Sequence, residues 1–479
     1  MNKKGLTYVI IFCVLAVTAS GCSLAPKYNR PKSPAPEAWP DGKAYKTIND
    51  GGDGRATSDI PWKEFFVNVP LQKVLDLALV NNRDLRVAMF NIEKMRALYR
   101  IQRSELFPGL NGNATANSQR ISESLSSTGD SMIARQYNLN VGISAYELDL
   151  FGRVKSLKNK ALEQFLATEQ ARSSTQIALV SEVAGAWLTL AADKERLKLA
   201  KDTFTAQQSS FSMIQRRFDL GASSELDLRQ AQTRVEAARL DMARYTGKVA
   251  QDENALILLV GSPVPADLLP ENLSVIDSKN SIIKQVNPSL PSSVLLSRPD
   301  ILAAERQLKA VNANIGAARA AFFPRITLTG TFGVASSELD NLFSEGTVWS
   351  FMPQISIPIF AGGRNKANLE AAKIDRDIAV ANYEKAIQNA FREVSDALAQ
   401  GGTVDDQITA QEALTYATAE SYRLSDVRYK KGIDSYLSVL DAQRSLYSAQ
   451  QAMIDARLLR LANRVTLYKV LGGGGLIEQ

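Results

Sequence analysis

One pair of carboxylates in the sequence has a spacing that could support acid–base chemistry. Glu147 and Asp149 lie two residues apart in YELDLFGR (146–153), so on an extended strand they would share one face, about 6.5–7 Å apart. Inverting glycosidases place an acid and a base at such a separation. However, the pair closes a predicted strand just before a predicted helix, and no cluster of aromatic residues for sugar binding surrounds it. We therefore predict that the chain is not an enzyme and has no catalytic residues.

The composition excludes several other kinds of site. The 479 residues include no histidine, which removes Ser-His-Asp and Cys-His catalysis and the commonest transition-metal ligand. We expect no metal site and no cofactor. The net charge is +6 without a long basic run, so nucleic-acid binding is not expected either. The mean hydropathy of −0.13 is typical of a soluble chain, but it is also compatible with a transmembrane β-barrel, whose strands alternate.

The N-terminus has the pattern of an exported and lipidated protein. Two lysines, an apolar core from Leu6 to Val17 and small residues predict a signal peptide over residues 1–21. The run ASGC resembles a bacterial lipobox, in which Cys22 would become the mature N-terminus and carry the lipid; an ordinary signal peptide with a chance cysteine is the alternative. Ser23, rather than Asp, favours sorting to the outer membrane. Residues 22–62 are rich in Pro and Gly and predict an extended, lipid-anchored segment.

The remainder of the chain contains one pattern twice. RRFDLGASSELDLRQAQ (216–232) matches VRYKKGIDSYLSVLDAQ (427–443) at an offset of 211 residues. Upstream of these stretches, Phe107-Pro108 matches Phe323-Pro324 at an offset of 216. We predict two structural repeats and a tail. The first repeat covers 63–270 with a β-hairpin at about 109–150, the second covers 271–474 with a β-hairpin at about 325–361, and the tail is 475–479.

Most of each repeat is predicted to be helical. Apolar residues recur at alternating spacings of four and three from Leu179 to Phe218, which is the seam of a coiled coil. This predicts a helix over about 155–213, roughly 85–90 Å long. A counterpart is expected over about 366–424, although Gly401-Gly402 would cost about 1 kcal/mol per glycine. Shorter helices at 84–106 and 225–260 would lie antiparallel to the first long helix, with tight turns at Gly221 and, in the second repeat, Gly432.

Four segments alternate as strands do, with one apolar face and one small polar face. They are YNLNVGIS (137–144), RITLTGTFGV (325–334), WSFMPQISIPIF (349–360) and, most weakly, GLNGNATANS (109–118). This alternation fits a wall between lipid and water. Pro353 and Pro358 predict irregular pairing in the last hairpin. A soluble β-sandwich is the alternative interpretation.

Four strands cannot close a barrel, and an open strand edge is not tolerated in lipid because its amides find no water. Two copies would give eight strands with a filled interior, whereas three would give twelve strands and a lumen of roughly 12 Å backbone radius. We therefore predict an α+β membrane protein. Three copies would form a 12-stranded transmembrane β-barrel, continued by a long antiparallel α-helical tube, with internal duplication in each chain. A coiled-coil structural lipoprotein without a pore is the alternative.

Several stretches resemble a known family. YELDLFGR, LSRPDILAAERQLKAVNANIGAARAAFFPRITLTG (296–330), DAQRSLYSAQ (441–450) and YKVLGGG (468–474) are similar to TolC-type outer-membrane factors, in particular to OprM-like efflux lipoproteins. The resemblance implies a homotrimer in the outer membrane of a Gram-negative bacterium, with its tube in the periplasm. It implies a periplasmic adaptor (membrane fusion) protein and an RND-type inner-membrane transporter as partners. The chain would be a passive exit duct for drugs and other small toxic compounds; a duct for type I protein secretion or metal efflux is the alternative.

The resemblance also implies a gate at the helical tips. It places Leu437 as an apolar plug and Asp441 as an acidic ring selective for cations. Asp227 matches a lock carboxylate and Tyr429 its tyrosine partner, while Asp434 replaces the arginine of some family locks. The alternative role of Asp227 and Asp441 is stabilisation of a helix N-terminus.

The tips would also form the docking site for the adaptor. Arg217 and Gly221 in the first repeat, and Arg428 and Gly432 in the second, are the expected contact residues. Glycine permits close backbone approach, and arginine grips carbonyl or carboxylate oxygens. The alternative is that each glycine simply makes the turn.

Overall fold

The computed structural model describes residues 23–45, 55, 57–127, 129–278, 291–344 and 346–474. The predicted signal peptide, Cys22 and the tail 475–479 lie outside these ranges. The chain divides into two compact units, and both draw on both halves of the sequence. The first unit combines Met1–Lys32, Asn91–Thr168 and Ala303–Tyr383, and the second combines Ser33–Phe90, Glu169–Leu302 and Glu384–Gln479.

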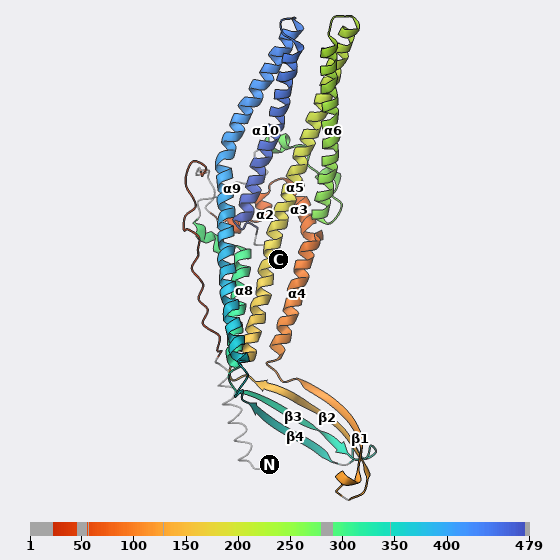
Figure 1. Ribbon diagram of the computed structural model, residues 1–479, viewed down its shortest axis with the longest axis vertical. Helices are drawn as coiled ribbons and strands as arrows, with labels where there is room; N and C mark the ends of the chain where they lie inside the picture. Colours follow the sequence, from red (N-terminus) through yellow and green to blue (C-terminus); the bar gives the residue numbers. More distant parts are fainter. Residues whose placement is uncertain are drawn as a thin grey trace. The chain divides into compact units, whose positions relative to one another are not determined.

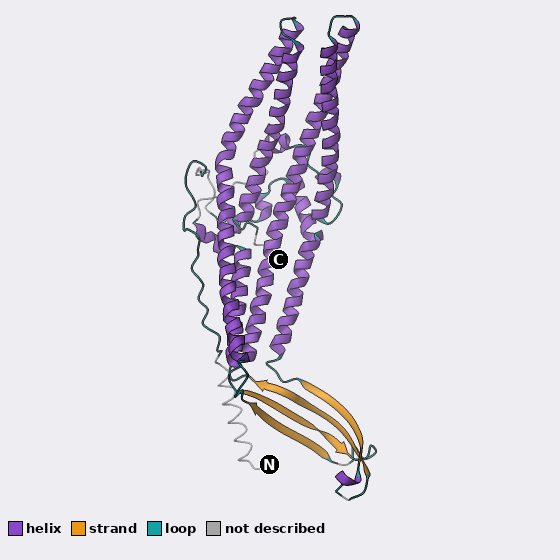
Figure 2. Cartoon of the chain, in the orientation of Figure 1, coloured by secondary structure: helices purple, strands orange, loops and turns teal. Residues whose placement is uncertain are grey.

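Helices make up most of the chain (Figures 1 and 2). The α-helices are α2 (Trp62–Phe65), α3 (Val69–Asn81), α4 (Arg83–Ser104), α5 (Arg153–Asp219), α6 (Glu225–Val260), α7 (Leu273–Ser278), α8 (Pro299–Ala320), α9 (Arg364–Lys430) and α10 (Tyr436–Val470). In the described ranges the short 3-10 helices are η1 (Thr57–Asp59), η2 (Glu123–Leu125), η3 (Ala266–Leu268) and η4 (Ser292–Ser297). The predicted long helices are confirmed, and α5 and α9 are both 67 residues long. The helix predicted at 225–260 has those bounds.

Gly401, one of the two glycines in the middle of α9, has a packing role. A Cβ atom at Gly401 would lie 3.0 Å from Oδ1 of Asn463 on α10. Asn463 is buried and its amide donates to Ala397 O and to Gln400 Oε1, both at 2.9 Å. The small residue therefore lets a buried polar side chain cross between the two helices with its donors satisfied. This contact offsets the low helix propensity of glycine.

Part of the predicted coiled-coil seam of α5 is buried, although its last member, Phe218, is 37% exposed. Leu179, Val183, Leu190 and Ile214 are each at most 5% exposed. Among the described helices, α5 is long and apolar enough to cross a membrane, judged by length and composition alone. However, 67% of its most apolar 18-residue window is buried inside the structure. The apolar side chains of this window therefore pack against neighbouring helices.

A charged cluster interrupts this seam in the second unit. Asp193 on α5 is 3% exposed and is contacted by Arg196, which also pairs with Asp455 on α10. Lys248 of α6 lies 4.0 Å from Asp193. Asp252 of α6 has its pKa raised to about 6, mainly by burial and further by hydrogen bonding to, and the charge of, Asp193. The Asp252 carboxyl is thus protonated more readily than an exposed aspartate.

The second repeat carries a neutral version of this cluster. Val404 and Asn463 stand 211 residues after Asp193 and Asp252. The packing of the helices is therefore compatible with an amide at the position of Asp252.

The strands form one four-stranded antiparallel sheet in the order β1-β2-β3-β4 (Figure 2). Its strands are β1 (Leu110–Ile121), β2 (Met132–Leu148), β3 (Arg325–Ser336) and β4 (Thr347–Ser356). The register places Val141 opposite Phe332, and Phe332 opposite Trp349, on one face. The other face is lined by small polar residues such as Asn113 and Asn140, which are paired and hydrogen-bonded at 3.4 Å.

Neither face of the sheet has the burial of a soluble core. Phe332, Trp349 and Phe351 are 65%, 75% and 64% exposed. The charged residues of the four strands lie near the strand ends: Arg120, Arg135, Glu147 and Arg325. Between them, β2 and β3 each have eleven uncharged residues, about 36 Å of strand or ~28 Å when tilted by ~40°. This band fits the apolar thickness of a membrane and does not fit a β-sandwich.

The prediction of irregular pairing at Pro353 is wrong. Pro353 pairs with Leu328 in an unbroken β3–β4 register, because β4 is the edge strand of the chain and proline is tolerated there. The irregularity lies in β2, where the register shifts between Ile143 and Tyr146 and Ala145 has a φ of 51°. Pro358 lies beyond the end of β4.

The start of the described chain is extended, as predicted, and its first part is bound to helices of the first unit. Asn312 donates to Pro26 O at 2.8 Å and Arg319 donates to Leu24 O at 3.0 Å. Arg30 pairs with Glu305 at 2.6 Å, and the side chain of Glu305 is only 5% exposed. This segment therefore has fixed polar partners along α8.

The raised pKa of Asp252 yields a test of the charged cluster. A carboxyl whose pKa in the folded protein exceeds its ordinary value of 3.8 stabilises the fold fully below about pH 4 and loses that contribution as the pH rises to about 6. Asp252→Asn should therefore raise the melting temperature above pH 7 by about 1–3 °C, after allowance for solvent screening. The gain should vanish below pH 4.

The measurement is a thermal melt of the purified assembly between pH 4 and pH 8. Asp219→Asn, at an exposed carboxyl on the same helical hairpin, is the matched control and should show no pH-dependent difference. A constant offset for Asp252→Asn at every pH would contradict the raised pKa of Asp252.

Candidate functional site: the helical tips

The turns between α5 and α6 and between α9 and α10 have the same geometry (Figure 2). Gly221 and Gly432 adopt φ values of 70° and 74°, in the left-handed region that favours glycine. The residue after each glycine donates its N–H to the carbonyl of Arg217 or Arg428, at 2.7 and 3.0 Å. A Cβ atom at either glycine would meet nothing within 4 Å. Both glycines are thus required by the turn and are open to solvent.

An apolar cluster lies beneath the two turns and joins the two hairpins. Its buried members are Ile214, Leu228, Ala231, Tyr436, Val439 and Leu440, with Phe211, Tyr422 and Tyr429 packed against them. Burial raises the pKa of Tyr436 to about 12. We call this set the tip cluster. Because it draws on α5, α6, α9 and α10, it holds the ends of the two hairpins together.

Arg217 adds a polar contact between the hairpins. Its Nη1 donates to the hydroxyl of Tyr429 at 3.1 Å, and its guanidinium lies 5.4 Å from the centre of the Tyr429 ring. A cation over an aromatic face is attracted by about 0.5–1 kcal/mol at an exposed site. The tyrosine of the predicted lock is therefore bonded to an arginine of the first repeat.

Arg428, the counterpart of Arg217, has a different partner. It donates to both carboxylate oxygens of Asp434, at 2.6 and 2.9 Å, and this hydrogen bonding lowers the pKa of Asp434. In the first repeat, Ser223 occupies the position of Asp434. Arg217 therefore has no carboxylate at this place and reaches Tyr429.

Asp227 lies in a capping box at the start of α6. Its carboxylate accepts from Ser224 N and Oγ at 3.3 and 2.8 Å, and its N–H donates to Ser224 Oγ. These bonds match the alternative of helix capping. The structure does not bring Asp227 and Tyr429 into a hydrogen bond within the described residues.

Leu437 and Asp441 lie near the start of α10 and face solvent. Leu437 is 52% exposed, and its first-repeat counterpart Leu226 is 66% exposed. Asp441 is paired with Arg444 at 3.2 Å, and both side chains are more than half exposed. Leu220 and Ile433, beside the two turn glycines, are 84% and 59% exposed. The sequence analysis missed these two residues, although an apolar residue next to a turn glycine is a visible signal.

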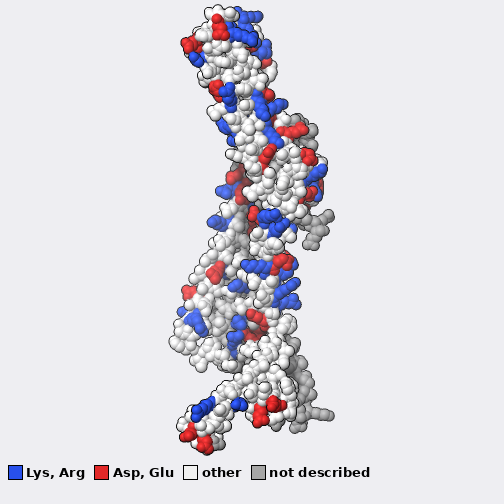
Figure 3. Space-filling model, turned by 90° about the vertical axis from the view of Figure 1, so that its right-hand side faces the viewer, with Lys and Arg blue, Asp and Glu red and all other residues white. Residues whose placement is uncertain are grey.

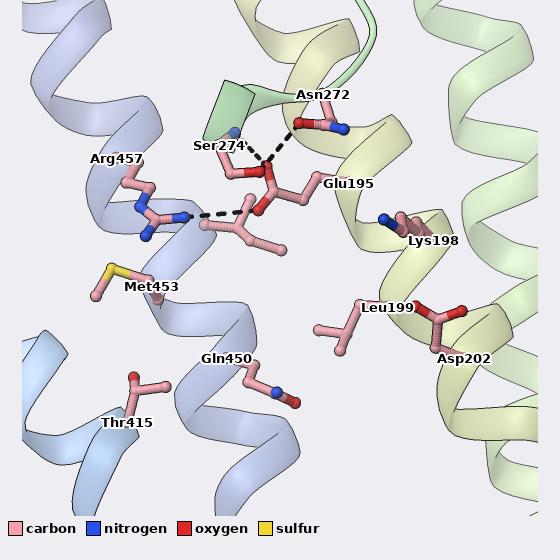
Figure 4. Close-up of a pocket in the computed structure, with 11 residues that line it drawn as sticks. Glu195, Lys198, Leu199, Asp202, Asn272, Ser274, Thr415, Gln450, Met453 and Arg457 are labelled. Carbon is pink, nitrogen blue, oxygen red and sulfur yellow. Dashed lines mark hydrogen bonds and ion pairs between the residues drawn. The ribbon is translucent and has the colours of Figure 1, made fainter. Parts of the chain in front are cut away.

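A second feature is a cavity of about 280 Å³ between α5 and α10 (Figure 4). The carboxylate of Glu195 accepts from Ser274 N at 2.7 Å and lies 3.7 Å from Arg457. Leu199 and Met453 form part of the wall. Glu195 therefore ties α7 to the two long hairpins, which is a structural role. Within the described residues no group of three or more His, Cys, Asp or Glu side chains could hold a metal ion.

Comparisons with known proteins agree with this architecture. The family model described as outer membrane efflux protein matches residues 74–262 and 290–473. The solvent efflux pump outer membrane protein SrpC of Pseudomonas putida is 50% identical over 96% of this chain and 97% of its own length. The antibiotic efflux pump outer membrane protein ArpC of Pseudomonas putida is 48% identical over 96% and 95%. The open state of the Neisseria gonorrhoeae MtrE outer membrane channel superposes with a TM-score of 0.83 at 37% identity, over 95% of this chain and 98% of that one.

This chain belongs to the outer membrane efflux protein family. It is the outer-membrane component of an efflux pump of a Gram-negative bacterium, it has the fold of the TolC-type outer-membrane channels, and it is not an enzyme. The two matched segments correspond to the two halves inferred from the 211-residue offset.

The carboxylates with glycosidase spacing serve the fold of the efflux protein. Glu147 is held by Arg153 at 2.7 Å and by Arg325 at 2.6 Å. Asp149 accepts from the backbone of Lys155 at 2.7 Å, in the first turn of α5. Both are thus engaged at the junction of strand and helix.

The surface of the efflux protein carries charges of both signs. On the face shown in Figure 3, Lys and Arg are interspersed with Asp and Glu along the helices. On α6, for example, Arg229 pairs with Glu225 and Arg239 with Glu236. Exposed pairs of this kind contribute little to stability. The contacts of Arg217 and Arg428 at the tips differ from them because Arg217 joins two hairpins and Arg428 binds both oxygens of one carboxylate.

The bond between Arg217 and Tyr429 can be tested by distance measurement. Spin labels at Leu220→Cys and Ile433→Cys would report the separation of the two turns by electron–electron resonance. Arg217→Ala should lengthen and broaden the distance distribution, because about 1 kcal/mol of contact between hairpins is lost. Arg229→Ala, at an exposed arginine near the same tip, should leave it unchanged. Identical distributions for both variants would show that Arg217 does not hold the hairpins.

Proposed function

We propose that three copies of the chain form one exit duct that crosses the outer membrane. The observation that carries this proposal is a four-stranded sheet with an uncharged band and two unpaired edges, β1 and β4. In lipid both edges need a partner, and twelve strands supply a closed wall with a wet lumen. Each half of the chain, 63–270 and 271–474, would act as one structural repeat of that wall.

The cargo would be small toxic compounds such as organic solvents and antibiotics. The names of SrpC and ArpC support this, since they describe solvent and antibiotic efflux. Transport through the duct would be passive, and an active partner would supply the energy.

The duct would work in a tripartite pump with a periplasmic adaptor and an RND-type inner-membrane transporter. We place adaptor docking at the tips, on Arg217, Gly221, Arg428 and Gly432. The open space over both glycines supports close approach of a partner backbone. The exposed Leu220 and Ile433 add apolar surface of the kind that marks protein interfaces.

We also propose lipid attachment at Cys22, in contact with outer-membrane lipid. Ser23 lies 3.3 Å from Ser156 in the first turn of α5, oxygen to oxygen. Ser23, the residue that follows Cys22 in the sequence, is therefore held near the strand–helix junction of the first unit. A lipid there would reach the membrane without a long linker.

The gate would use the tip residues in distinct roles. Leu437 would form the apolar plug, and Asp441 would form the acidic ring. Tyr429 would be held by Arg217 when the gate is closed, and Asp227 would keep α6 in place through its capping box. The exposure of Leu437 and Asp441 in one chain supports contact with symmetry-related copies.

Conductance in planar bilayers tests the pore and the gate together. Leu437→Ala should increase the conductance because it removes the apolar plug, and Asp441→Asn should reduce cation selectivity because it removes the acidic ring. Leu226→Ala is the matched control, since it removes the equivalent leucine of the first repeat and should leave conductance unchanged. A chain with Leu437→Ala and Asp441→Ala that never conducts would refute the gate.

The mass of the detergent-solubilised assembly tests barrel closure. Native mass spectrometry should give three copies per particle. One or two copies per stable particle would rule out the twelve-stranded wall, whatever the conductance.

A further inference from the structure

The two long helices begin in different electrostatic surroundings. Arg153 and Arg364 occupy equivalent positions, 211 residues apart, as the first residues of α5 and α9. Arg153 is bound bidentately by Glu147, at 2.8 and 2.7 Å. It also feels the charges of Glu105 and Asp149, which raise its pKa further after the hydrogen bond to Glu147.

Arg364 has none of these three carboxylates. The second-repeat counterparts of Glu105, Glu147 and Asp149 are neutral: Ala321, Pro358 and Phe360. Within the described part of the chain, no ion pair of Arg364 is present. The two repeats thus share the arginine but differ at all three of these carboxylate positions.

A cavity of about 300 Å³ lies beside Arg364 in the first unit. Three arginines line it, namely Arg153, Arg325 and Arg364, together with the carboxylates of Glu147 and Asp149. Glu147 is shared between Arg153 and Arg325. The three arginines in the lining exceed the two carboxylates by one positive charge. Arg364 is the arginine of the three that has no carboxylate partner among the described residues.

Exposed apolar side chains adjoin this cavity in the sequence. Ile357 and Ile359 flank Pro358, which lines the cavity, and with Phe360 they are 60%, 94% and 90% exposed. Phe323 in the wall stacks on Phe151 at 4.7 Å. The residues follow β4 directly, at the end of the uncharged band that crosses the membrane. An unbalanced arginine beside exposed apolar and aromatic residues, at the depth of lipid headgroups, matches an anionic headgroup with its acyl chains.

We propose that the cavity beside Arg364 binds the phosphodiester group of a membrane phospholipid. The guanidinium would grip the phosphate oxygens, and the acyl chains would lie over Ile357, Ile359 and Phe360. Arginine suits this role because its planar donors match two phosphate oxygens. A free phosphate ion would satisfy the arginine but would leave these apolar side chains uncovered. The proposal rests on the membrane placement of the sheet and is independent of the gate.

Native mass spectrometry of the detergent-solubilised assembly, titrated with dioleoylphosphatidylglycerol, tests the site. Arg364→Ala should weaken lipid binding at least about fivefold, the effect of one cation near a lipid surface. Arg376→Ala is the matched control on α9, at an exposed arginine paired with Asp377. Phe360→Asp, which restores the carboxylate that the first repeat has in Asp149, should also weaken lipid binding while leaving the number of copies unchanged.

Two further arms separate the alternatives. Inorganic phosphate should not displace the lipid at equal concentration; displacement, or binding of phosphate alone, would show an anion site without lipid. Loss of copies from the assembly in Arg364→Ala, with lipid binding unchanged in the remaining trimers, would show that Arg364 pairs with a neighbouring chain and would overturn the proposal. A correct trimer that binds no lipid would refute this site and leave the duct intact.

Discussion

The demand that every backbone amide in lipid finds a partner shapes this molecule more than any other constraint. The sheet pairs β2 and β3 on both sides, but β1 and β4 each keep one unpaired edge. A soluble protein could leave such an edge to water, whereas a wall in hydrocarbon has to be closed. The uncharged band, the exposed Trp349 and Phe351 and the near-absence of a buried face all follow from this demand. In the proposed trimer, other copies would supply this closure.

The duplication provides a nearly regular wall, and its departures from regularity carry the specific chemistry. Arg217 and Arg428 are equivalent, yet Ser223 and Asp434 send them to different partners. Asp252 and Asn463 are equivalent, yet one is a carboxyl with a raised pKa and the other donates amide hydrogen bonds. In both cases the helices keep their course, because the backbone does not depend on the side-chain charge. The halves are thus alike in shape and different in interactions.

Much of the fold could be predicted from the sequence because it depends on periodicity. The seam of α5, the bounds of α6 and the turns at Gly221 and Gly432 follow from spacing and from the φ that glycine permits. The regular pairing of Pro353 could not be predicted, since it depends on which strand forms the edge. The contacts within the candidate site were harder to predict from the sequence. Spacing placed Tyr429 at the tip, but its bond to Arg217 depends on side-chain directions that only the packed hairpins define.

The equal length of α5 and α9 has a consequence for how such a chain can change. A heptad inserted into one hairpin alone would raise its turn about 10 Å above the other and pull Ile214 and Leu228 out of reach of Tyr436 and Leu440. Only an insertion of the same size in both halves would preserve the junction. The two hairpins can therefore lengthen or shorten only by matching amounts. An insertion or deletion in one half of the chain is tolerated only when the other half carries one of the same size.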